Sequence, residues 1–560
     1  MKKILISLVI IILTFPSMWI LLKPGYFSMH DDLQVMRIYE LERCFSDGQI
    51  PCRWAPDMAY GYGQPMFNFY SAFPYYLGAF IRMVTPLSIM ATVRVLFLIS
   101  ILGSAFGMFF LVRRFYGNLG GILSSMAYTY APYHALDIYV RGALSESFAL
   151  MILPYIFLFT YFIIEKVTLK RIIFLSLSLY VLFTSHNIST LIYFPYVVVW
   201  VLFWIVFLKK WKSIYALGFS LILGFGLSAF FLLPNLFEQT LIQKESLISD
   251  YYFYPSHFVS LKQLFLERDW GYGPSTFGPN DEMSLQIGWP YWQLGIILGL
   301  LTLLSVKKKM KITNLLTLVI LAMGGISAYL THQRSFFIWE AIPILSYVQF
   351  PWRFLGLTIF FLSFSLGMLV SGKAILKIII FVLTLLLIIS LNASYFKPEH
   401  YWFWATDREK LTGIQFELQQ KAAILDYLPK TAKSAPQGKP PQNPEIISGK
   451  GIIENFSNRS NNFFFDAVVH EKAEIQIPVT YFPGWIVIVE GKEIPSYSSG
   501  DLGLVTIDLD RGNYIVHGRF VDTPIRFIGN SISALTFLLI LSVIILTDSN
   551  KSVLRSYGNA

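Results

Sequence analysis

The stretch Ile4–Leu22, ILISLVIIILTFPSMWILL, decides the fold of this protein. It carries no charged side chain and is long enough, as a helix, to cross the roughly 30 Å hydrocarbon core of a bilayer. Lys2 and Lys3 precede it, and no small-residue cleavage site of the kind that ends a signal peptide follows it. We therefore predict an uncleaved first transmembrane helix whose start faces the cytoplasm.

Eleven further apolar runs follow this first one, so the sequence predicts about twelve transmembrane helices. A break at Ser185-His186-Asn187 interrupts one long apolar stretch, and we interpret it as a tight outer turn between two helices. A single kinked helix there would reverse the orientation of every later helix. The later runs are centred roughly on residues 95–112, 119–133, 147–164, 172–186, 189–208, 214–233, 291–306, 313–330, 354–370, 378–395 and 527–547.

The composition and the placement of charge support a membrane protein. Hydrophobic residues make up 55% of the chain and charged residues 14%, against about 25% charged residues in soluble domains. The net charge is +10, but the short breaks that we assign to the cytoplasm hold 18 basic and two acidic residues. The rest of the chain is net acidic, so the basic excess indicates topology and not nucleic-acid binding. We expect a multi-pass protein of the cell (cytoplasmic or inner) membrane with both termini in the cytoplasm.

Three long outer segments set the expected domain organisation. Residues 1–395 form a multi-helix transmembrane domain with a first outer loop at 23–90 and another at 234–290. Residues 396–526 form an extracytoplasmic domain with a Pro-rich linker at 429–445, and period-two alternation after that linker predicts a small antiparallel β-sandwich. A last transmembrane helix at 527–547 and a cytoplasmic tail at 548–560 complete the chain.

The first outer loop begins with the stretch MHDDL at residues 29–33, which contains two adjacent carboxylates, Asp31 and Asp32. Such a pair can hold a divalent cation or accept a proton from an acceptor hydroxyl, and repulsion between the two raises one pKa. The alternative is that both residues cap the following helix, which is common for carboxylates and is the favoured interpretation from residue chemistry alone.

A second group of polar residues lies at residues 133–146, YHALDIYVRGALSE, between two apolar runs. On a helix Asp137 and Arg141 share one face, which is typical of a local ion pair. Glu146 lies at the mouth of an apolar helix, where an ionisable group is costly without a partner. This position favours a role for Arg141 in binding an anionic ligand and for Glu146 in orienting it.

Two further motifs place aromatic and charged residues together. The stretch ERDWGYGPS at residues 267–275 combines Asp269 and Trp270 in a pattern that suits sugar recognition, although a polar loop with an interfacial aromatic belt looks much the same. The stretch QFPWR at 349–353 ends in Arg353, which could bind the phosphate of a lipid carrier or anchor a helix at the interface. Cys44 and Cys52 could form a disulfide or remain free thiols, because spacing alone does not decide.

The ordered set of these motifs resembles the bacterial membrane proteins of the 6-pyruvoyl-tetrahydropterin synthase-related family, which are similar to the GT-C superfamily of glycosyltransferases. The residues that carry the resemblance are His30-Asp31-Asp32, WAPDMAYGYGQP at 54–65, YVRGA at 139–143 with Glu146, and FPWR at 350–353. YFPGW at 481–485 with EGK at 490–492 resembles the outer domain of YfhO-like relatives. The histidine triad of soluble pterin enzymes is missing, so the family name is no guide to chemistry here.

The resemblance implies an enzyme that transfers a hexosyl or pentosyl group on the outer face of the membrane. The donor would be a polyprenyl-phosphate sugar, and the acceptor a glycan, lipid or protein of the cell envelope. Asp31 and Asp32 would be catalytic, with a divalent cation such as Mg or Mn as a possible cofactor, although the pair departs from the Asp-Glu or Asp-x-Asp pattern of related enzymes. The residues expected to bind substrate are His30, Arg37, Asp57, Tyr60, Gln64, Asp137, Arg141, Glu146, Asp269, Trp270 and Arg353.

Two other functions fit the same architecture. A transporter or flippase for a lipid-linked glycan would carry charged residues near the middle of its helices, and the predicted helix centres are nearly free of them. An assembly scaffold whose outer β-domain binds envelope polymer would not need the acidic pair. Both remain alternatives to the glycosyltransferase.

Overall fold

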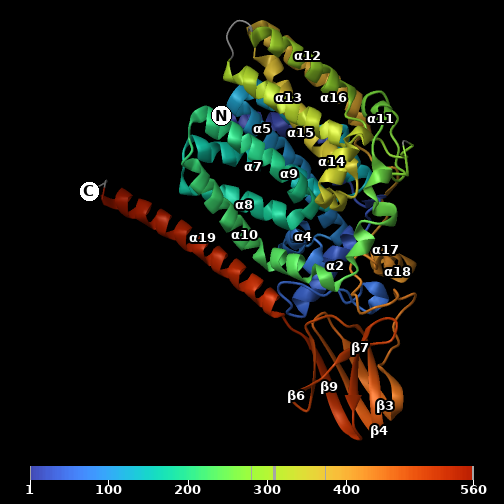
Figure 1. The fold of residues 1–560 in the computed structure, drawn as a ribbon. Coiled ribbons are helices and arrows are strands. Elements are labelled where there is room, and N and C mark those ends of the chain that lie inside the picture. The colour runs from blue at the N-terminus through green and yellow to red at the C-terminus, as the bar shows by residue number, and fades with distance from the viewer. Residues whose placement is uncertain (1, 279, 307–310, 372–373, 558–560) are drawn as a thin grey trace. The chain divides into compact units, whose positions relative to one another are not determined.

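The computed structural model describes residues 2–278, 280–306, 311–371 and 374–557 (Figure 1). Four lysines of the predicted cytoplasmic breaks, Lys307–Lys309 and Lys373, lie outside the described residues. The chain divides into two compact units, which we describe separately. Unit 1 comprises Met1–Val35, Phe80–Leu217 and Leu247–Asp407, and unit 2 comprises Met36–Ala79, Gly218–Ser246 and Arg408–Ala560.

Helices dominate the described part of the chain, and most strands come late in the sequence. The α-helices are α1 (Lys2–Met18), α2 (Gln34–Ser46), α3 (Met66–Phe69), α4 (Phe73–Val84), α5 (Ile89–Thr129), α6 (Pro132–Ala135), α7 (Leu144–Glu165), α8 (Leu169–Ser185), α9 (Asn187–Leu208), α10 (Ser213–Glu238), α11 (Leu261–Phe265), α12 (Trp289–Val306), α13 (Ile312–Leu330), α14 (Phe336–Ala341), α15 (Leu355–Leu366), α16 (Ala374–Asn392), α17 (Asp407–Leu411), α18 (Gly413–Lys421) and α19 (Pro524–Tyr557). The strands are β1 (Tyr26–Phe27), β2 (Tyr401–Trp402), β3 (Glu445–Asn458), β4 (Asn462–Thr480), β5 (Trp485–Val489), β6 (Lys492–Ile494), β7 (Tyr497–Ser499), β8 (Leu504–Leu509) and β9 (Gly512–Phe520).

The predicted polytopic helical architecture is confirmed. Within the described residues, nine helices are long and apolar enough to cross a membrane, and Trp289–Ser305 is a shorter apolar helix. The span Ile89–Thr129 covers two of the predicted runs. Gly117 leaves the helical conformation with a φ of 75° and so divides the span into two helices. The chain folds back there, as the hydrogen bond from Ser125 Oγ to Ala105 O (2.6 Å) shows. When the two halves of α5 are counted separately and α12 and the 17-residue α8 are included, each of the twelve predicted runs corresponds to a helix.

The break at residue 186 separates two helices, as predicted. α8 ends at Ser185 and α9 begins at Asn187, while His186 between them has extended backbone angles. The ring of His186 caps α9 by accepting a hydrogen bond from the backbone N–H of Ser189 (3.2 Å). A single kinked helix is therefore wrong for this stretch.

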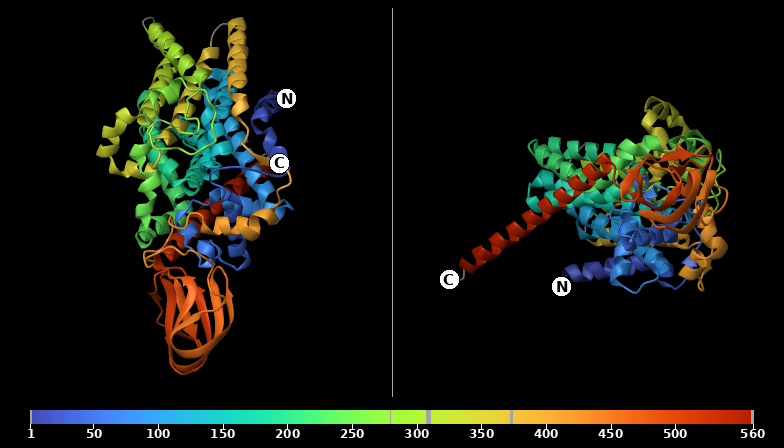
Figure 2. Two further views of the ribbon diagram at one scale, coloured as in Figure 1. Left: turned by 90° about the vertical axis from the view of Figure 1, so that its right-hand side faces the viewer. Right: turned by 90° about the horizontal axis from the view of Figure 1, so that it is seen from below.

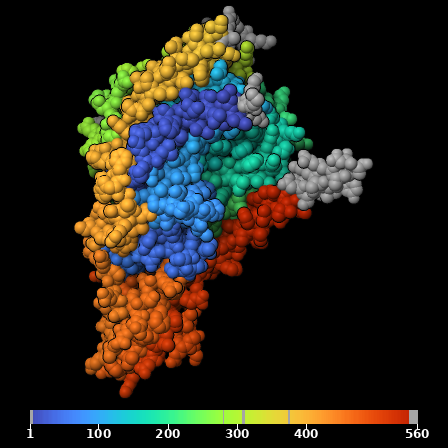
Figure 3. Space-filling model, turned by 180° about the vertical axis from the view of Figure 1, so that it is seen from behind, coloured from blue at the N-terminus to red at the C-terminus, as the bar shows by residue number. Residues whose placement is uncertain are grey.

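The helices of unit 1 differ in how much of their surface the protein covers. The span Pro351–Val370, which includes α15, is almost entirely buried, and α5 and α7 pack closely against each other. By contrast, most of the span that contains α16 is not buried by the protein. Figure 3 shows α1 and α16 uncovered on one face of this unit. An apolar helix face without protein cover is the surface expected to meet lipid, because it has no polar groups to offer water.

The β-rich part of unit 2 is one antiparallel sheet and not two separate sheets. Its strand order is β6-β5-β9-β4-β8-β7, with β3 paired to β4. The long strand β4 pairs with β9 through residues 462–469 and with β8 through residues 473–480, so one strand serves both halves (Figure 2). The predicted period-two alternation is clear in β4 but not in β3, whose residues lie largely exposed.

Side chains from outside the sheet complete its core. Alternate residues of β4 from Phe463 to Val479 face inward, as the period of two requires. Trp54, Phe69 and Ile242 pack into the same cluster, and the Trp54 ring meets Trp485 edge-on at 5.5 Å. The β-rich part therefore shares its hydrophobic core with two segments that lie far away in the sequence.

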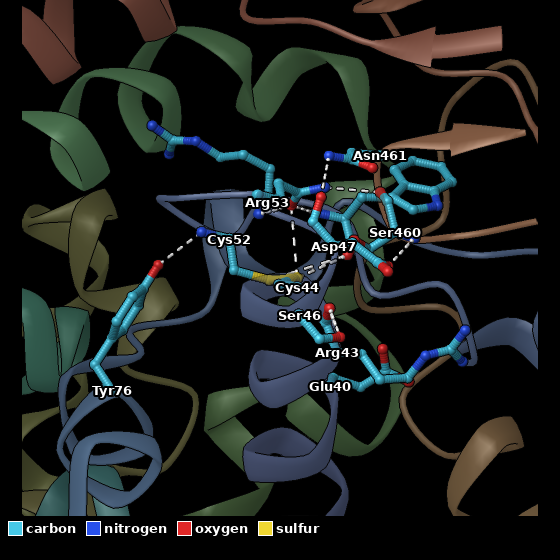
Figure 4. The surroundings of a disulfide bond; sticks show 12 residues. Glu40, Arg43, Cys44, Ser46, Asp47, Cys52, Arg53, Tyr76, Ser460 and Asn461 are labelled. Carbon is cyan, nitrogen blue, oxygen red and sulfur yellow. Dashed lines mark hydrogen bonds between the residues drawn. A yellow bond between two sulfur atoms is a disulfide. The ribbon is translucent and has the colours of Figure 1, made fainter. Parts of the chain in front are cut away.

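A disulfide joins Cys44 and Cys52 and holds the intervening loop against the sheet (Figure 4). The Asp47 carboxylate accepts a hydrogen bond from Ser460 N (2.8 Å), and Asn461 donates to Asp47 O (2.9 Å). Tyr76 accepts from the backbone N–H of Cys52 (3.0 Å). The open question about the two cysteines is thus answered in favour of a bond that braces the loop next to the β3–β4 turn.

We expect the double substitution Cys44→Ala with Cys52→Ala to destabilise unit 2 by about 2 kcal/mol. The bond lowers the conformational entropy of the unfolded chain, and this effect is modest because the cross-linked loop is short. The measurement is the thermal unfolding midpoint in detergent, followed by tryptophan fluorescence. Added reductant should lower the midpoint of the natural protein and leave that of the variant unchanged. Equal midpoints for the two proteins without reductant would show that the bond does not contribute to stability.

Candidate functional site

Four charged side chains meet in the interior of unit 1. Arg141 Nη1 lies 2.8 Å from Asp137 Oδ1 and 2.9 Å from Glu146 Oε2, and Arg353 Nε lies 3.8 Å from the same Glu146 oxygen. None of the four side chains is more than 11% exposed. Charges are rarely buried in this way unless they are paired, because burial removes their hydration. The sequence motifs at 133–146 and 349–353 therefore form one site.

Local backbone structure brings the two carboxylates onto one arginine. Residues Leu136–Val140 form a single π-helical turn, a feature often found at functional sites. Gly142 then adopts a φ of +62°, and a Cβ at this position would come within 2.4 Å of Met29 Sδ. This turn requires glycine, and it allows α7 to start at Leu144 with Glu146 in its first turn.

Aromatic side chains enclose the cluster. Tyr133 donates a hydrogen bond to Glu146 Oε1 (2.6 Å), and the Arg141 guanidinium lies 4.6 Å from the ring centre of Trp352. Trp352 in turn donates to Ser275 Oγ (3.2 Å). Arg353 donates to Val348 O (2.7 Å) and Gln349 Oε1 (2.9 Å). The cation–π contact adds attraction that does not consume the hydrogen-bonding capacity of the guanidinium.

The charge state of the cluster depends on Asp137. Burial and the nearby Glu146 carboxylate raise the pKa of Asp137 well above its usual value, while Arg141 lowers it. Burial lowers the pKa of Arg141, but Glu146, Tyr133 and Asp137 outweigh that effect and the net shift is upward. Oδ2 of Asp137 accepts no hydrogen bond from any described residue. When Asp137 holds a proton, the two arginines and Glu146 leave one net positive charge, which favours an anion.

Backbone hydrogen bonds join the segment that carries the acidic pair, Asp31 and Asp32, to the segment that carries Arg141. The N–H of His30 donates to Val140 O (3.0 Å), and the N–H of Asp31 donates to Arg141 O (2.9 Å). The side chain of Gln34 fixes the junction by donating to Asp31 O and Gly142 O, each at 2.8 Å. Asp31 and Asp32 are half-buried and precede α2, which begins at Gln34. The backbone contacts thus join two motifs that are about 110 residues apart.

The remaining predicted residues of unit 1 lie around a different loop. His30 Nε2 is 2.8 Å from Tyr272 O, while Asp269 is exposed. Trp270 stacks on Tyr395 with ring centres 4.5 Å apart and planes tilted by 12°. A ring already stacked on a neighbour offers only one face to a sugar. The structure therefore links His30 to this loop by a hydrogen bond but leaves Asp269 outside the buried cluster.

Four predicted binding residues belong to unit 2, where each has structural contacts. Arg37 donates to Tyr75 (3.1 Å) and lies 4.0 Å over the ring of Tyr70. Asp57 forms an ion pair with Arg43. Gln64 donates to Ile424 O (2.9 Å), and Tyr60 sits in a left-handed turn with a φ of 60°. A role in substrate binding stays a prediction for all four residues.

The acidic pair alone is a sparse metal site. Mg²⁺ prefers six oxygen ligands but often takes only one or two from protein carboxylates, with water and phosphate supplying the rest. In the described part of the chain, no group of three or more His, Cys, Asp or Glu side chains is arranged to hold a metal ion. Asp31 and Asp32 could contribute at most two protein ligand groups, so we derive no step through a metal.

Sequence reasoning missed a network behind Trp352. Ser275 donates to Asp281 Oδ1 (2.6 Å) and pairs with His257 Nδ1 (2.9 Å), while Gln263 donates to Asp281 Oδ2 (2.7 Å). These residues position Trp352 and do not touch the charged cluster themselves. The sequence could not reveal this network, because no spacing rule connects Asp281 to a tryptophan about 70 residues later.

The substitution Glu146→Gln should cost about 3–5 kcal/mol of stability, because Arg141 and Arg353 would lose the carboxylate that pairs with both in the protein interior. Glu165→Gln, on the same helix, is the matched control. Glu165 pairs with Arg114 and Arg171 near the surface, where such pairs contribute at most about 1 kcal/mol. Thermal unfolding in detergent would compare the two variants. A small effect at Glu146 would contradict the pairing described here.

Unit 2 contains a second buried carboxyl group, that of Glu40. Its Oε1 accepts a hydrogen bond from Asp57 N (3.2 Å), and Oε2 accepts none from the described residues. Burial, followed by the Asp57 carboxylate, raises the pKa of Glu40 well above its usual value, although Arg43 lowers it. The folded protein therefore keeps this proton at pH values where the unfolded chain has already lost it.

Glu40 should make unit 2 less stable as the pH rises. Above the ordinary glutamate pKa the folded state binds more protons than the unfolded state, so the free energy of unfolding falls until the pH passes the raised pKa. Glu40→Gln should remove this dependence and unfold at a higher temperature than the natural protein at pH 8, with a smaller difference at pH 4.5. Glu471→Gln, at an exposed position, should show no such trend. A constant difference for Glu40→Gln across this range would contradict the raised pKa.

The protein is similar to one curated protein and, more distantly, to a solved structure. An uncharacterized protein of Lactococcus lactis subsp. cremoris (strain MG1363) is 26% identical over 243 residues, covering 42% of this chain and 39% of that protein. The oligosaccharyltransferase of Archaeoglobus fulgidus, tethered by a disulfide to an acceptor peptide, matches with a TM-score of 0.39 and 11% identity over 71% of this chain and 55% of that one. Its apo form gives 0.34 and 14%, over 70% and 56%. This chain spans about two fifths of the first relative and just over half of the second.

The likeness to the oligosaccharyltransferase is too weak to assign a substrate or an activity.

The sequence matches, over residues 67–400, the family model described as "6-pyruvoyl-tetrahydropterin synthase related domain; membrane protein". That region contains the buried cluster and most of the apolar helices, and it makes up more than half of the chain. The protein thus belongs to the 6-pyruvoyl-tetrahydropterin synthase-related family of membrane proteins, as its motifs predicted.

Proposed function

We propose that this protein is a GT-C-type glycosyltransferase that moves a sugar from a polyprenyl-phosphate-linked donor to a cell-envelope acceptor. One observation carries the proposal: the backbone N–H of Asp31 donates to Arg141 O (2.9 Å), so the acidic pair adjoins the buried arginine cluster. Such a transfer needs a base for the acceptor hydroxyl and positive charge for the departing phosphate. The Asp31–Asp32 pair and the Arg141–Arg353 cluster are the two corresponding groups.

The proposed reaction forms one bond and breaks one. The acceptor hydroxyl oxygen attacks the anomeric carbon of the sugar, and the bond from that carbon to the phosphate oxygen breaks. Asp31 or Asp32 takes the hydroxyl proton, and the polyprenyl phosphate leaves with the bonding electrons. Arg141 and Arg353 stabilise the phosphate, and a protonated Asp137 gives the cluster its net positive charge. A divalent cation held by Asp31 and Asp32 would add further positive charge beside the phosphate.

The positions of the charges in the helices support an enzyme over a transporter. Glu146 is in the first turn of α7, and Arg353 is near the start of the span Pro351–Val370. Both side chains are thus at helix ends, where a phosphate at the membrane interface could reach them, and not at helix centres. A transport path would need polar groups at mid-membrane depth. The predicted topology places this end of the helices on the outer face.

Asp31→Asn and Asp32→Asn should each reduce sugar transfer to the level of a membrane that lacks the protein, because an amide cannot take the acceptor proton. The measurement is mass spectrometry of envelope glycans and lipid-linked sugars from cells with and without each variant. Protein abundance in the membrane should stay unchanged. Asp510→Asn, in an exposed turn between β8 and β9, is the control and should transfer normally.

Two results would overturn the proposal. One is full transfer by the variant that carries both Asn substitutions, which would leave the acidic pair without a catalytic role. The other is an unchanged profile of glycans and lipid-linked sugars when the gene is deleted. A scaffold would instead tolerate the loss of both carboxylates while its deletion altered envelope composition.

A further inference from the structure

We propose that His186 is a further phosphate-binding residue of the candidate site, and that its Nε2–H group donates a hydrogen bond to the phosphate of the lipid-linked donor. The proposal rests on the proposed function, because it adds a third residue to the phosphate site formed by Arg141 and Arg353. All three residues belong to unit 1. Three features support this role: the level of His186 along the helices, the ring nitrogen that carries its proton, and the access to that nitrogen.

The hairpin of α7 and α8 returns the chain to the level of Glu146. The two helices pack against each other and are joined by residues 166–168, so they run in opposite directions (Figure 1). Glu146 lies 19 residues before the end of α7 at Glu165, and His186 lies 17 residues after the start of α8 at Leu169. At about 1.5 Å of rise per residue, the two positions differ by only about 3 Å along the helix axes. His186 is therefore at the same depth as the charged cluster.

The charges of the cluster act on the His186 ring. Burial lowers the pKa of this ring below its ordinary value, while Glu146 opposes the shift and Arg353 and Arg141 add to it. The ring is therefore close enough to these three side chains for their charges to affect it, and it stays neutral near pH 7. A neutral imidazole has one nitrogen that donates a hydrogen bond and one that accepts.

The hydrogen bonds at the start of α9 determine which nitrogen of His186 donates. Nδ1 accepts from the backbone N–H of Ser189 (3.2 Å), a group that can only donate, and lies 2.7 Å from Ser189 Oγ. A proton on Nδ1 would point at that N–H group, so the proton of the neutral ring is on Nε2. His186 is thus a donor at Nε2 and cannot accept a proton there, which leaves the role of base to Asp31 or Asp32.

Nε2 is the atom of His186 that remains available to a ligand. Within the part of the chain that the structure describes, it forms no hydrogen bond and is not sealed from solvent. Capping α9 does not explain a histidine here, because asparagine, aspartate or serine would cap the helix without a second ring nitrogen. A fixed N–H donor binds a phosphate more strongly as that phosphate gains negative charge, so it would stabilise the departing group.

The test measures how tightly the purified full-length protein, in nanodiscs, binds a polyisoprenyl monophosphate that carries no sugar. His186→Asn should weaken this binding about tenfold, because asparagine keeps the helix cap but does not reach the phosphate. Binding of the corresponding polyisoprenol, which has no phosphate, should stay unchanged. His332→Asn is the matched control. His332 also caps a helix through Nδ1, by accepting from Arg334 N (3.0 Å), and its variant should bind the monophosphate normally.

A second measurement probes the same contact without a variant. Exchange of the ring Cε1–H of histidine for deuterium, followed by mass spectrometry, depends on access to the ring. The rate at His186 should fall at least threefold when the polyisoprenyl monophosphate is bound and should not change with the polyisoprenol. The rate at His332 should stay the same in all samples.

The outcomes separate this role of His186 from the proposed function. Equal binding of the monophosphate by His186→Asn and the natural protein would overturn the role and leave the proposed donor in place. Weaker binding of both lipids would show that His186 maintains the structure and does not contact the phosphate. If His186→Asn folds poorly, an unchanged exchange rate at His186 with the monophosphate would exclude the contact. Failure of the natural protein to bind the monophosphate would instead contradict the proposed function, and the role of His186 with it.

Discussion

The pairing of buried charge is the constraint on which the candidate site depends. Two arginines and two carboxyl groups lie together in the interior of unit 1, and the arginines and Glu146 could not remain ionised there without one another. The arrangement requires a π-helical turn and a left-handed glycine so that Asp137, Arg141 and Glu146 converge. It also requires Arg353 from a helix that begins some 200 residues later. A stable protein does not need such a cluster, since apolar residues could fill the same space, so its presence favours a function that uses charge.

Much of the fold could be predicted from the sequence because membrane helices are specified locally. Each apolar run has to satisfy its own backbone hydrogen bonds, so its length and composition suffice to identify it. The turn at His186 was predicted correctly for the same reason: a short polar break ends one run and starts the next. Strand β3 could not be recognised in this way, because it pairs with β4 but its largely exposed residues show little apolar alternation.

The site could be predicted only in part, because its contacts join residues that are far apart in the sequence. Residues 133–146 were identified because they carry charge at the mouth of an apolar helix, and Arg353 because it follows an aromatic motif. Their mutual contact depends on how distant helices pack, which no local pattern encodes. The role of Ser275 and Asp281 behind Trp352 follows from side-chain geometry alone. Likewise, Glu40 reads as an ordinary polar residue of α2 until the structure shows that it is fully buried.

Unit 2 cannot complete its folding until late in synthesis, because it is assembled from three separated parts of the chain. Trp54 belongs to the core of a sheet whose strands begin at Glu445, so nearly 400 residues are made before this ring finds its partners. Until then, the early segment, with its two cysteines, lacks the sheet that will cover it. Such delayed closure leaves apolar side chains open to wrong contacts and to chaperones. The cross-link between Cys44 and Cys52 needs no late partner, so it can form first and restrict the waiting segment to a compact loop.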